Sequence, residues 1–124
     1  MLYKYKKDYK KIAMGLLSFI NNLKEVSRLS SEFDWYEAQD DRCLFLWKNE
    51  NKDFCGIIGA EISDTIIMVR HIAVSPQFRA EGISDKMLTA LANRYPEHKM
   101  MGSFEVAPLI TKWEKNHGQE RKKI

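Results

Sequence analysis

The sequence predicts an α+β fold in which helices pack against a mixed β-sheet. Three β-rich segments, residues 43–47, 54–62 and 65–74, follow one another with only short polar turns between them, which predicts an antiparallel meander. Apolar residues recur at helical spacing before this meander and again after it.

The N-terminal part is predicted to hold a short edge strand and two helices. Residues 2–6 alternate apolar and charged side chains, as in an edge strand whose lysines discourage pairing with other chains. Asp8 can cap the first helix. Asn22 and Glu25 resemble a capping box for a second helix, which runs to about Phe33. One face of the first helix carries Ile12, Leu16, Phe19 and Ile20.

The strands of the meander are bounded by turn-forming residues. Residues 48–53 join the first two strands and are rich in Asn and Asp, which favour turns. Ser63 and Asp64 turn the chain into residues 65–74, a run with many β-branched side chains that suit a packed, pleated surface. Pro76 ends this strand, because proline has no N–H to donate to a ladder.

The C-terminal part is predicted to contain two helices with a strand between them. The first helix spans residues 82–94, and Pro96 prevents its continuation. Residues 99–106 form the strand, and the last helix runs from Pro108 to Gly118, with a frayed, charged tail after it. The helical spacing after Gly82 is carried by Ile83, Met87, Leu88 and Leu91.

Composition favours a single soluble domain covering residues 1–124. Hydrophobic residues make up 44% and charged residues 30% of the chain, and no apolar run approaches the ~20 residues of a membrane span. Without a signal peptide at its start, the chain is expected to be cytoplasmic. The net charge of +3 suits a polyanionic ligand but is too small to indicate a nucleic-acid partner.

The cysteines and histidines give no sign of a metal site. Cys43 and Cys55 lie in strand-like runs without CxxC spacing, so buried, reduced thiols are the favoured interpretation. A nucleophilic Cys55 is the alternative, although no activating neighbour is evident in the sequence. The three histidines show no ligand spacing, so no metal is expected.

The junction between the predicted strand 65–74 and the next helix has the features of a diphosphate cradle. A helix start carries free backbone N–H groups and a partial positive charge, both of which attract anions. Gly82 has no side chain to keep a phosphate from the backbone, and Arg79 offers a fork of donors for phosphate oxygens. The junction lacks the Gly-Lys-Ser/Thr of a Walker loop and the three glycines of a Rossmann fingerprint.

These residues also carry a family resemblance. The pattern Val-x-Pro-x-x-Arg-x-x-Gly-Ile-Ser at residues 74–84 resembles the acetyl-CoA-binding motif of the GNAT N-acetyltransferase superfamily, Arg/Gln-x-x-Gly-x-Gly/Ala. It departs from that motif only at Ser84, where another small residue replaces Gly or Ala. Residues 11–19 and 70–74 are similar to RibT-type members of the superfamily, which some Gram-positive bacteria encode in riboflavin operons. The resemblance fades after about Glu105.

The resemblance implies a GNAT fold with the element order β-α-α-β-β-β-α-β-α and a splayed pair of parallel strands. It implies acetyl-CoA as the acyl donor, with an amine acceptor of unknown identity and no metal. Pantetheine would pair with the backbone of Ile72, Ala73 and Val74. The pyrophosphate would bind at Arg79, Ala80, Glu81, Gly82, Ile83 and Ser84.

The acid, the base and the acceptor site are less clearly indicated. Members of the family often use a carboxylate or a histidine near the central strand as base, which makes His71 and Glu61 the candidates. His71 has a suitable intrinsic pKa, although a lone strand histidine is more often structural. Arg70 and Tyr36 are candidates for the acceptor site, with an ion pair and packing against the sheet as their respective alternatives.

Many relatives carry a tyrosine on the last helix that protonates the leaving thiolate. This chain has Trp113 in that helix, and an indole cannot replace a hydroxyl as that acid. His117 is a weak substitute because it lies near the helix end.

Two functional hypotheses follow. The first is an enzyme that transfers acetyl to an amine, with a connection to flavin metabolism. The second is a catalytically weak or inactive CoA-binding module that acts through partners, which the missing tyrosine favours. A nucleic-acid-binding domain is disfavoured, no membrane association is expected, and a homodimer stays open.

Overall fold

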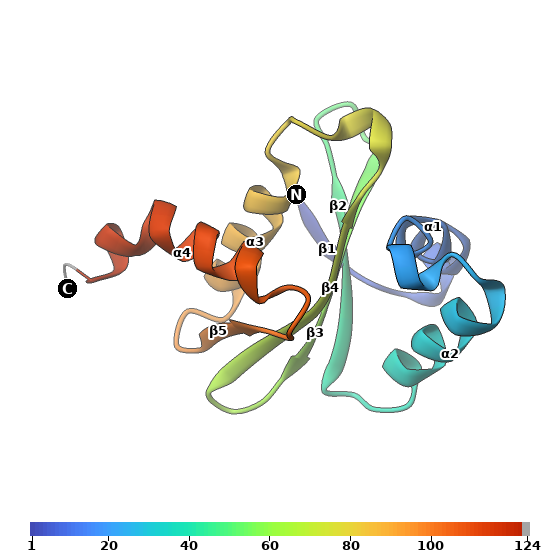
Figure 1. Cartoon of the computed structure of the whole chain (residues 1–124), viewed down its shortest axis with the longest axis horizontal. Coiled ribbons are helices and arrows are strands. Elements are labelled where there is room, and N and C mark those ends of the chain that lie inside the picture. The colour runs from blue at the N-terminus through green and yellow to red at the C-terminus, as the bar shows by residue number, and fades with distance from the viewer. Residues whose placement is uncertain (123–124) are drawn as a thin grey trace.

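The computed structural model describes residues 1–122, which form a five-stranded sheet with helices on both faces (Figure 1). The strands are β1 (Leu2–Lys4), β2 (Arg42–Lys48), β3 (Phe54–Ile62), β4 (Ile66–Val74) and β5 (Lys99–Gly102). The helices are α1 (Lys10–Leu17), α2 (Val26–Glu37), α3 (Ile83–Arg94) and α4 (Ala107–Lys122). The element order and the mixed sheet confirm the predicted α+β class.

The strands lie in the order β1-β2-β3-β4-β5, and only the last pair is parallel. The parallel pairing of β4 with β5 begins where Lys99 N–H donates to Thr65 O at 2.8 Å and ends at Val69, whose carbonyl accepts from Ser103 N–H at 2.9 Å. Residues 70–74 of β4 therefore continue beyond the end of β5 and stay paired only with β3. This divergence confirms the predicted splay of the parallel pair.

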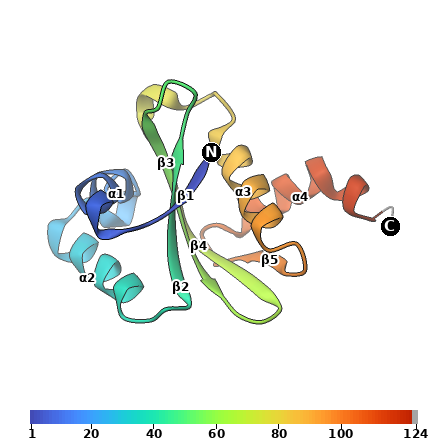
Figure 2. The same ribbon diagram turned by 180° about the vertical axis from the view of Figure 1, so that it is seen from behind.

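Helices cover the sheet on both faces, so the molecule has two hydrophobic cores. Figures 1 and 2 show α1 and α2 on one face and α3 and α4 on the other. Side chains of β2 alternate between these cores: Cys43 and Phe45 pack with α3 and α4, whereas Leu44 and Leu46 pack with α1 and α2. Burial on both faces explains why the central strands read as continuous apolar runs.

Each helix buries one apolar face. The buried side chains of α2 recur at spacings of four and three residues, and those of α3 follow the same periodicity, as expected for helices on a sheet. The α2 set is Leu29, Phe33 and Tyr36, and the α3 set is Ile83, Met87, Leu88, Leu91 and Ala92.

Several predicted boundaries near the N-terminus were wrong. The first strand ends at Lys4, and Asp8 lies in a 3-10 turn rather than capping α1. The helix α1 ends at Leu17, so Phe19 lies in the α1–α2 connection and does not pack on the helical face. The predicted capping box is absent, because α2 begins after Glu25 and residues 21–23 form a 3-10 turn.

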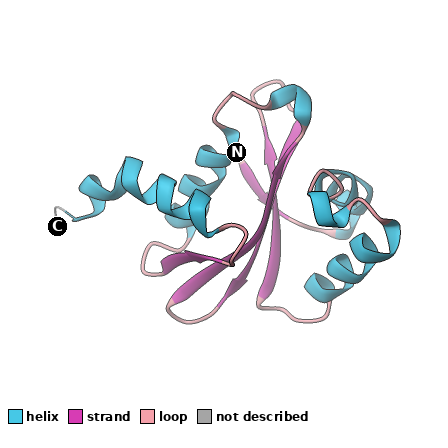
Figure 3. Ribbon diagram, viewed as in Figure 1, coloured by secondary structure: helices cyan, strands magenta, loops and turns pink. Residues whose placement is uncertain are grey.

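The boundaries near the C-terminus also differ from the prediction. The strand β5 ends at Gly102 because the chain turns there: the Val106 and Ala107 amides both donate to Ser103 O, at 2.9 and 2.7 Å. The helix α4 continues through Gly118, and its last turns extend beyond the sheet (Figure 3). Its predicted end at Gly118 was therefore wrong. No helix within residues 1–122 is long and apolar enough to cross a membrane.

Candidate active site

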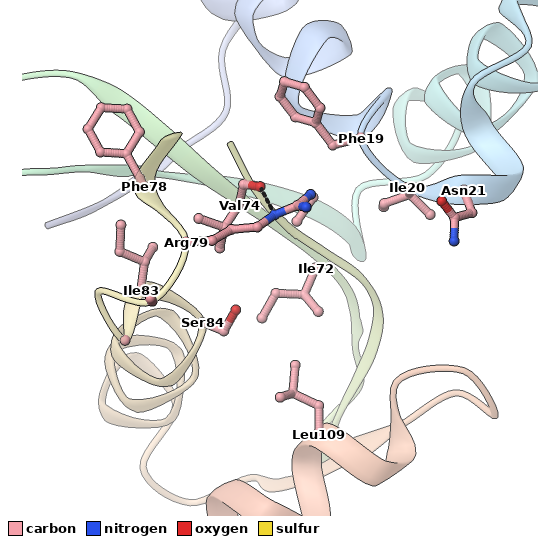
Figure 4. A pocket seen from close by; sticks show the side chains of 13 residues that line it. Phe19, Ile20, Asn21, Ile72, Val74, Phe78, Arg79, Ile83, Ser84 and Leu109 are labelled. Atoms are coloured by element: carbon pink, nitrogen blue, oxygen red, sulfur yellow. Dashed lines mark hydrogen bonds between the residues drawn. The ribbon is translucent and has the colours of Figure 1, made fainter. Parts of the chain in front are cut away.

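A groove of about 630 Å³ lies where β4 diverges from β5 (Figure 4). It is bounded by the α1–α2 connection on one side and by the β4–α3 loop, α3 and α4 on the other. The lining residues are Phe19, Ile20, Asn21, Ile72, Ala73, Val74, Phe78, Arg79, Ala80, Gly82, Ile83, Ser84 and Leu109.

The floor of the groove is the open edge of β4. Ser75 N–H donates to Cys55 O at 2.8 Å, which makes these two opposed residues a hydrogen-bonded pair. In an antiparallel ladder such pairs alternate with pairs whose peptide groups face away from the partner strand. The N–H and C=O groups of Ile72 and Val74 therefore point away from β3, towards the side on which β5 has ended. An extended ligand can pair with them as a neighbouring strand would.

The wall at the start of α3 presents unpartnered backbone amides. Arg79 N–H donates to Pro76 O at 3.3 Å and Lys86 N–H donates to Gly82 O at 3.0 Å. The amides of residues 80–85 make no hydrogen bond within residues 1–122, and α3 has no side-chain cap. Six free donors at a helix N-terminus attract an anion through direct hydrogen bonds and through the helix dipole.

The backbone conformation before α3 shapes this anion site. Ala80 has φ of 73° and Gly82 has φ of 71°, both in the left-handed region, with Glu81 between them. Turns that mix left-handed and right-handed residues gather successive N–H groups into a concave nest for anions. A Cβ built on Gly82 would meet nothing within 4 Å, so the space beside this residue is open.

The Arg79 side chain is exposed, and it lies across the mouth of the groove. Its Nε donates to Val74 O at 3.2 Å, and Figure 4 shows the guanidinium directed towards the α1–α2 connection. The side chain therefore places a positive charge between the open β4 edge and the free amides. It also occupies the Val74 carbonyl, which a strand-like ligand would approach.

The structure brings together most of the residues predicted to bind a cofactor. All but one of them line the groove, from Ile72 on β4 to Ser84 in the first turn of α3. The exception is Glu81, which lines a different hollow of about 610 Å³ together with Lys48 and Lys86. Its amide still belongs to the free run.

His71 is held between two side chains of α2. Its Nδ1 lies 2.5 Å from the Tyr36 hydroxyl oxygen, and its Nε2 lies 3.4 Å from Glu32 Oε2. Tyr36 is buried and packs over Gly59, the residue opposite His71 on β3. This agrees with the packing alternative for Tyr36.

Burial controls the protonation of this pair. It lowers the pKa of His71 from 6.5 to about 4, with Glu105 acting in the opposite direction and Arg70 in the same one. Burial also raises the pKa of the Tyr36 hydroxyl, and the Glu32 carboxylate adds to that effect. At neutral pH the tyrosine is therefore protonated and the imidazole is neutral. The tautomer with its hydrogen on Nε2 fits both neighbours, because Tyr36 O–H can then donate to Nδ1 while Nε2 lies beside the Glu32 carboxylate, which only accepts.

Glu61 and Arg70, the remaining candidates for the base and the acceptor site, pair with each other and do not line the groove. Arg70 Nε donates to Glu61 Oε1 at 2.7 Å, and the Arg70 guanidinium lies 5.5 Å from the Trp35 ring centroid. A β-bulge leaves Arg70 without an opposed residue on β3, because Gly59 pairs with His71 and Ala60 pairs with Val69. The ion-pair alternative for Arg70 is therefore the arrangement observed.

The helix α4 contributes an apolar side chain to the groove. Leu109 lines it, and α4 contains no tyrosine. Trp113 is buried, with its Nε1 donating to Thr89 Oγ1 at 3.0 Å. His117 pairs with Asp85 in the first turn of α3, with Nε2 3.0 Å from Oδ2.

Sequence reasoning missed the opposite wall of the groove and one carboxylate. Phe19 and Ile20 were predicted to lie on the first helix, and neither Asn21 nor Glu32 was singled out. These residues lie far from β4 in the chain, so a short-range sequence pattern does not predict their contacts with it. No local signal marks this wall, because Phe19 continues the helical spacing of the residues before it.

The fold and the groove define a protein that can hold an extended anionic ligand between two diverging parallel strands. The sequence profile of the acetyltransferase (GNAT) family matches residues 8–109, and the chain belongs to this family. It is 41% identical to an uncharacterized N-acetyltransferase encoded in the lysA 3′ region of Bacillus methanolicus, over 97% of this chain and 100% of that protein.

Solved structures support the same fold. The aminoglycoside N-acetyltransferase AAC(6')-Iy in complex with CoA superimposes with a TM-score of 0.67 and 17% identity, covering 96% of this chain and 84% of that one. Glucosamine-6-phosphate N-acetyltransferase from Arabidopsis thaliana superimposes with a TM-score of 0.62 and 15% identity, covering 91% of this chain and 88% of that one. At these identities the likeness concerns the fold alone.

Proposed function

We propose that this protein transfers an acetyl group from acetyl-CoA to an amine. The observation that carries the proposal is the row of six free amides, residues 80–85, at one end of the open β4 edge. A diphosphate at these amides would place the rest of a CoA thioester along Val74 and Ile72. The family to which the chain belongs supports this assignment.

The residues of the groove then have separate tasks. The six amides and Arg79 hold the diphosphate, because a single helix-end charge interaction contributes only ~0.3–2 kcal/mol. The N–H of Val74 and the N–H and C=O of Ile72 hold the pantetheine arm in an extended conformation and restrict its motion. An N–H in this segment also stabilises the oxyanion that forms when the amine attacks the thioester carbonyl, an effect of roughly 3 kcal/mol for one such donor.

The helix α4 has no tyrosine to protonate the leaving thiolate. Leu109 is its side chain in the groove, and Trp113 is buried. A thiolate with a solution pKa of ~8.5 is a tolerable leaving group, so transfer can proceed without such an acid. The same absence favours the alternative function, a CoA-binding module that has little catalytic activity and acts through partners.

The sequence likeness to RibT-type proteins supports a place for the reaction in flavin metabolism. Amine-bearing precursors of flavins therefore belong among the acceptors to be tested. The likeness does not name the acceptor.

Thermal denaturation with and without acetyl-CoA tests the donor site. Acetyl-CoA at ~100 times its Kd should stabilise the fold by about 2.7 kcal/mol, and Arg79→Ala should reduce that effect at a fixed concentration. Lys99→Ala is the matched control, since it removes one exposed positive charge at the far end of β4 and should leave the response unchanged. An identical midpoint with and without acetyl-CoA would count against both the enzyme and the module.

A further inference from the structure

We propose that Glu32 is the general base that takes a proton from the acceptor ammonium group, and that Tyr36 and His71 hold its carboxylate in position. This inference rests on the proposed acetyl transfer and names a further residue for it. His71 is then a positioning residue rather than the base.

Glu32 lies at a separate hollow of about 380 Å³, which is formed by the α1–α2 connection and α2. Glu32 approaches the groove through His71: its Oε2 lies 3.4 Å from His71 Nε2, and the next residue on β4, Ile72, lines the groove. Asn21 also lines the groove, and its chain neighbour Asn22 lines the hollow. Glu32 is the only carboxylate among the residues of that hollow. Its side chain is 40% exposed, which leaves it open to an incoming amine, whereas His71 is only 14% exposed. The hollow is lined by Asn22, Leu23, Ser27, Arg28, Ser31 and Glu32.

The orientation of Glu32 follows from a chain of three side chains. In the Nε2–H tautomer, the Tyr36 O–H donates to His71 Nδ1 over 2.5 Å. The Nε2 atom lies 3.4 Å from Glu32 Oε2, which is an ion-pair distance. The other oxygen, Oε1, makes no hydrogen bond within the described part of the chain, so it is available to the acceptor.

The three side chains have distinct roles because their environments differ. Both nitrogens of His71 are engaged, and burial keeps its ring from holding a proton at neutral pH. It therefore cannot store the proton of an ammonium group, whereas it can orient a carboxylate. Tyr36 cannot move aside easily, because its ring is packed over Gly59 on the sheet.

Acetyl transfer begins with a proton transfer and ends with the release of CoA–SH. The Glu32 carboxylate removes one proton from R–NH3⁺, which leaves R–NH2 with a free electron pair. This pair forms the C–N bond to the thioester carbonyl carbon, and collapse of the oxyanion breaks the C–S bond. The excess proton on the amide nitrogen passes to the thiolate, giving CoA–SH, and Glu32 returns its proton to water.

Steady-state kinetics with a defined acceptor panel test the role of Glu32. CoA release is measured with kanamycin, spermidine, glucosamine 6-phosphate and hydroxylamine, the last of which is largely unprotonated at neutral pH. For a protonated amine that wild type accepts, Glu32→Gln should lower kcat about 100-fold or more, with the acetyl-CoA Kd within 2-fold of wild type. With hydroxylamine the loss should be under 10-fold. Asp34→Asn, which removes an exposed carboxylate from the same helix, should match wild type.

The position of the His71 ring hydrogen gives a readout that does not need an acceptor. Nitrogen-15 spectra at pH 7 distinguish the two neutral tautomers, and the His71 signal is assigned by its loss in His71→Gln. The proposal requires the Nε2–H tautomer in wild type and a mixture of tautomers in Tyr36→Phe. Tyr36→Phe should also lower kcat while leaving acetyl-CoA affinity unchanged.

Three results would overturn the inference. They are an Nδ1–H tautomer in wild type, an unchanged kcat in Glu32→Gln, or an equal loss with hydroxylamine and protonated amines. Acetyl transfer would survive each of them. Acetyl-CoA binding without CoA release from wild type across the whole panel would overturn the base role and favour the module, and absence of acetyl-CoA binding would overturn the proposed function itself.

Discussion

Ala80 adopts a backbone conformation that its methyl group disfavours. Its φ of 73° lies in the left-handed region, where the Cβ of an L-residue crowds the following carbonyl at a cost of roughly 1–2 kcal/mol. Two residues later, Gly82 adopts the same region without that cost, because it has no side chain. The strain lies in the segment whose amides are free, which is where strained residues often serve a binding site.

Substitution of these two residues should have opposite effects on stability. Ala80→Gly removes the crowding but makes the unfolded chain more flexible, so we expect a net gain of ~0.5–1 kcal/mol. Gly82→Ala should lose about 1 kcal/mol through conformation alone, because its methyl group has open space. Urea denaturation without CoA measures both. Destabilisation by Ala80→Gly would mean that the left-handed conformation is absent in solution.

His71 links the stability of the fold to pH. Its pKa is about 4 in the folded protein and 6.5 when exposed, so between these values the unfolded chain binds more protons than the native one. The stability that it contributes is fully present above pH 6.5 and is lost as the pH falls towards 4. The change is on the order of 3 kcal/mol.

Denaturation of wild type and His71→Gln at pH 7 and at pH 4.5 should show this effect. Wild type should lose more stability than the variant between the two pH values, because glutamine does not titrate and every carboxylate is common to both proteins. Equal losses would show that His71 is accessible to protons in the folded state.

At the scale of the elements, Gly59 lets α2 approach the sheet. A Cβ on Gly59 would overlap the Tyr36 hydroxyl and ring, so the close contact of α2 with β3 depends on the missing side chain. The same contact places the Tyr36 hydroxyl against His71 on the neighbouring strand. One residue on β3 thereby positions two side chains from other elements.

Gly59→Ala should therefore destabilise the fold by ~1–3 kcal/mol and break the Tyr36–His71 hydrogen bond. Gly15→Ala is a suitable control, because Gly15 is exposed in α1 with nothing within 4 Å of an added methyl, and alanine there should stabilise by ~0.5–1 kcal/mol. Chemical denaturation measures the free energy of unfolding of wild type and of the two variants. An unchanged free energy of unfolding in Gly59→Ala would show that α2 can shift away from the sheet without cost.

The sequence was sufficient for the elements whose signals are local. The strands β2, β3 and β4 are marked by apolar runs between turn residues, and the start of α3 is marked by Gly82. The end of α1 could not be predicted, because Phe19 continues the helical spacing although the chain leaves the helix after Leu17. Its position is decided by tertiary packing.

The candidate site shows the same division. The β4–α3 side of the groove is one continuous segment with a recognisable pattern. The opposite wall and Glu32 come from α1 and α2, far from β4 in the chain. No short-range pattern links Glu32 to His71, and free backbone amides have no side-chain signature.

At the scale of the whole molecule, the groove exists because two parallel strands diverge beneath helices from both ends of the chain. The α1–α2 connection, β4, α3 and α4 all line it, so its shape depends on the completed fold. The free N–H groups of residues 80–85 and of Ile72 and Val74 are then presented to one ligand.

An amide-resolved NMR titration with CoA tests this account most directly. The account predicts saturable shifts that are largest for the amides of residues 80–85, with further shifts at Ile72 and Val74. The Ala73 amide, which already pairs with β3, should move much less. Binding that leaves the amides of residues 80–85 unmoved, or no saturable shift at all, would contradict it.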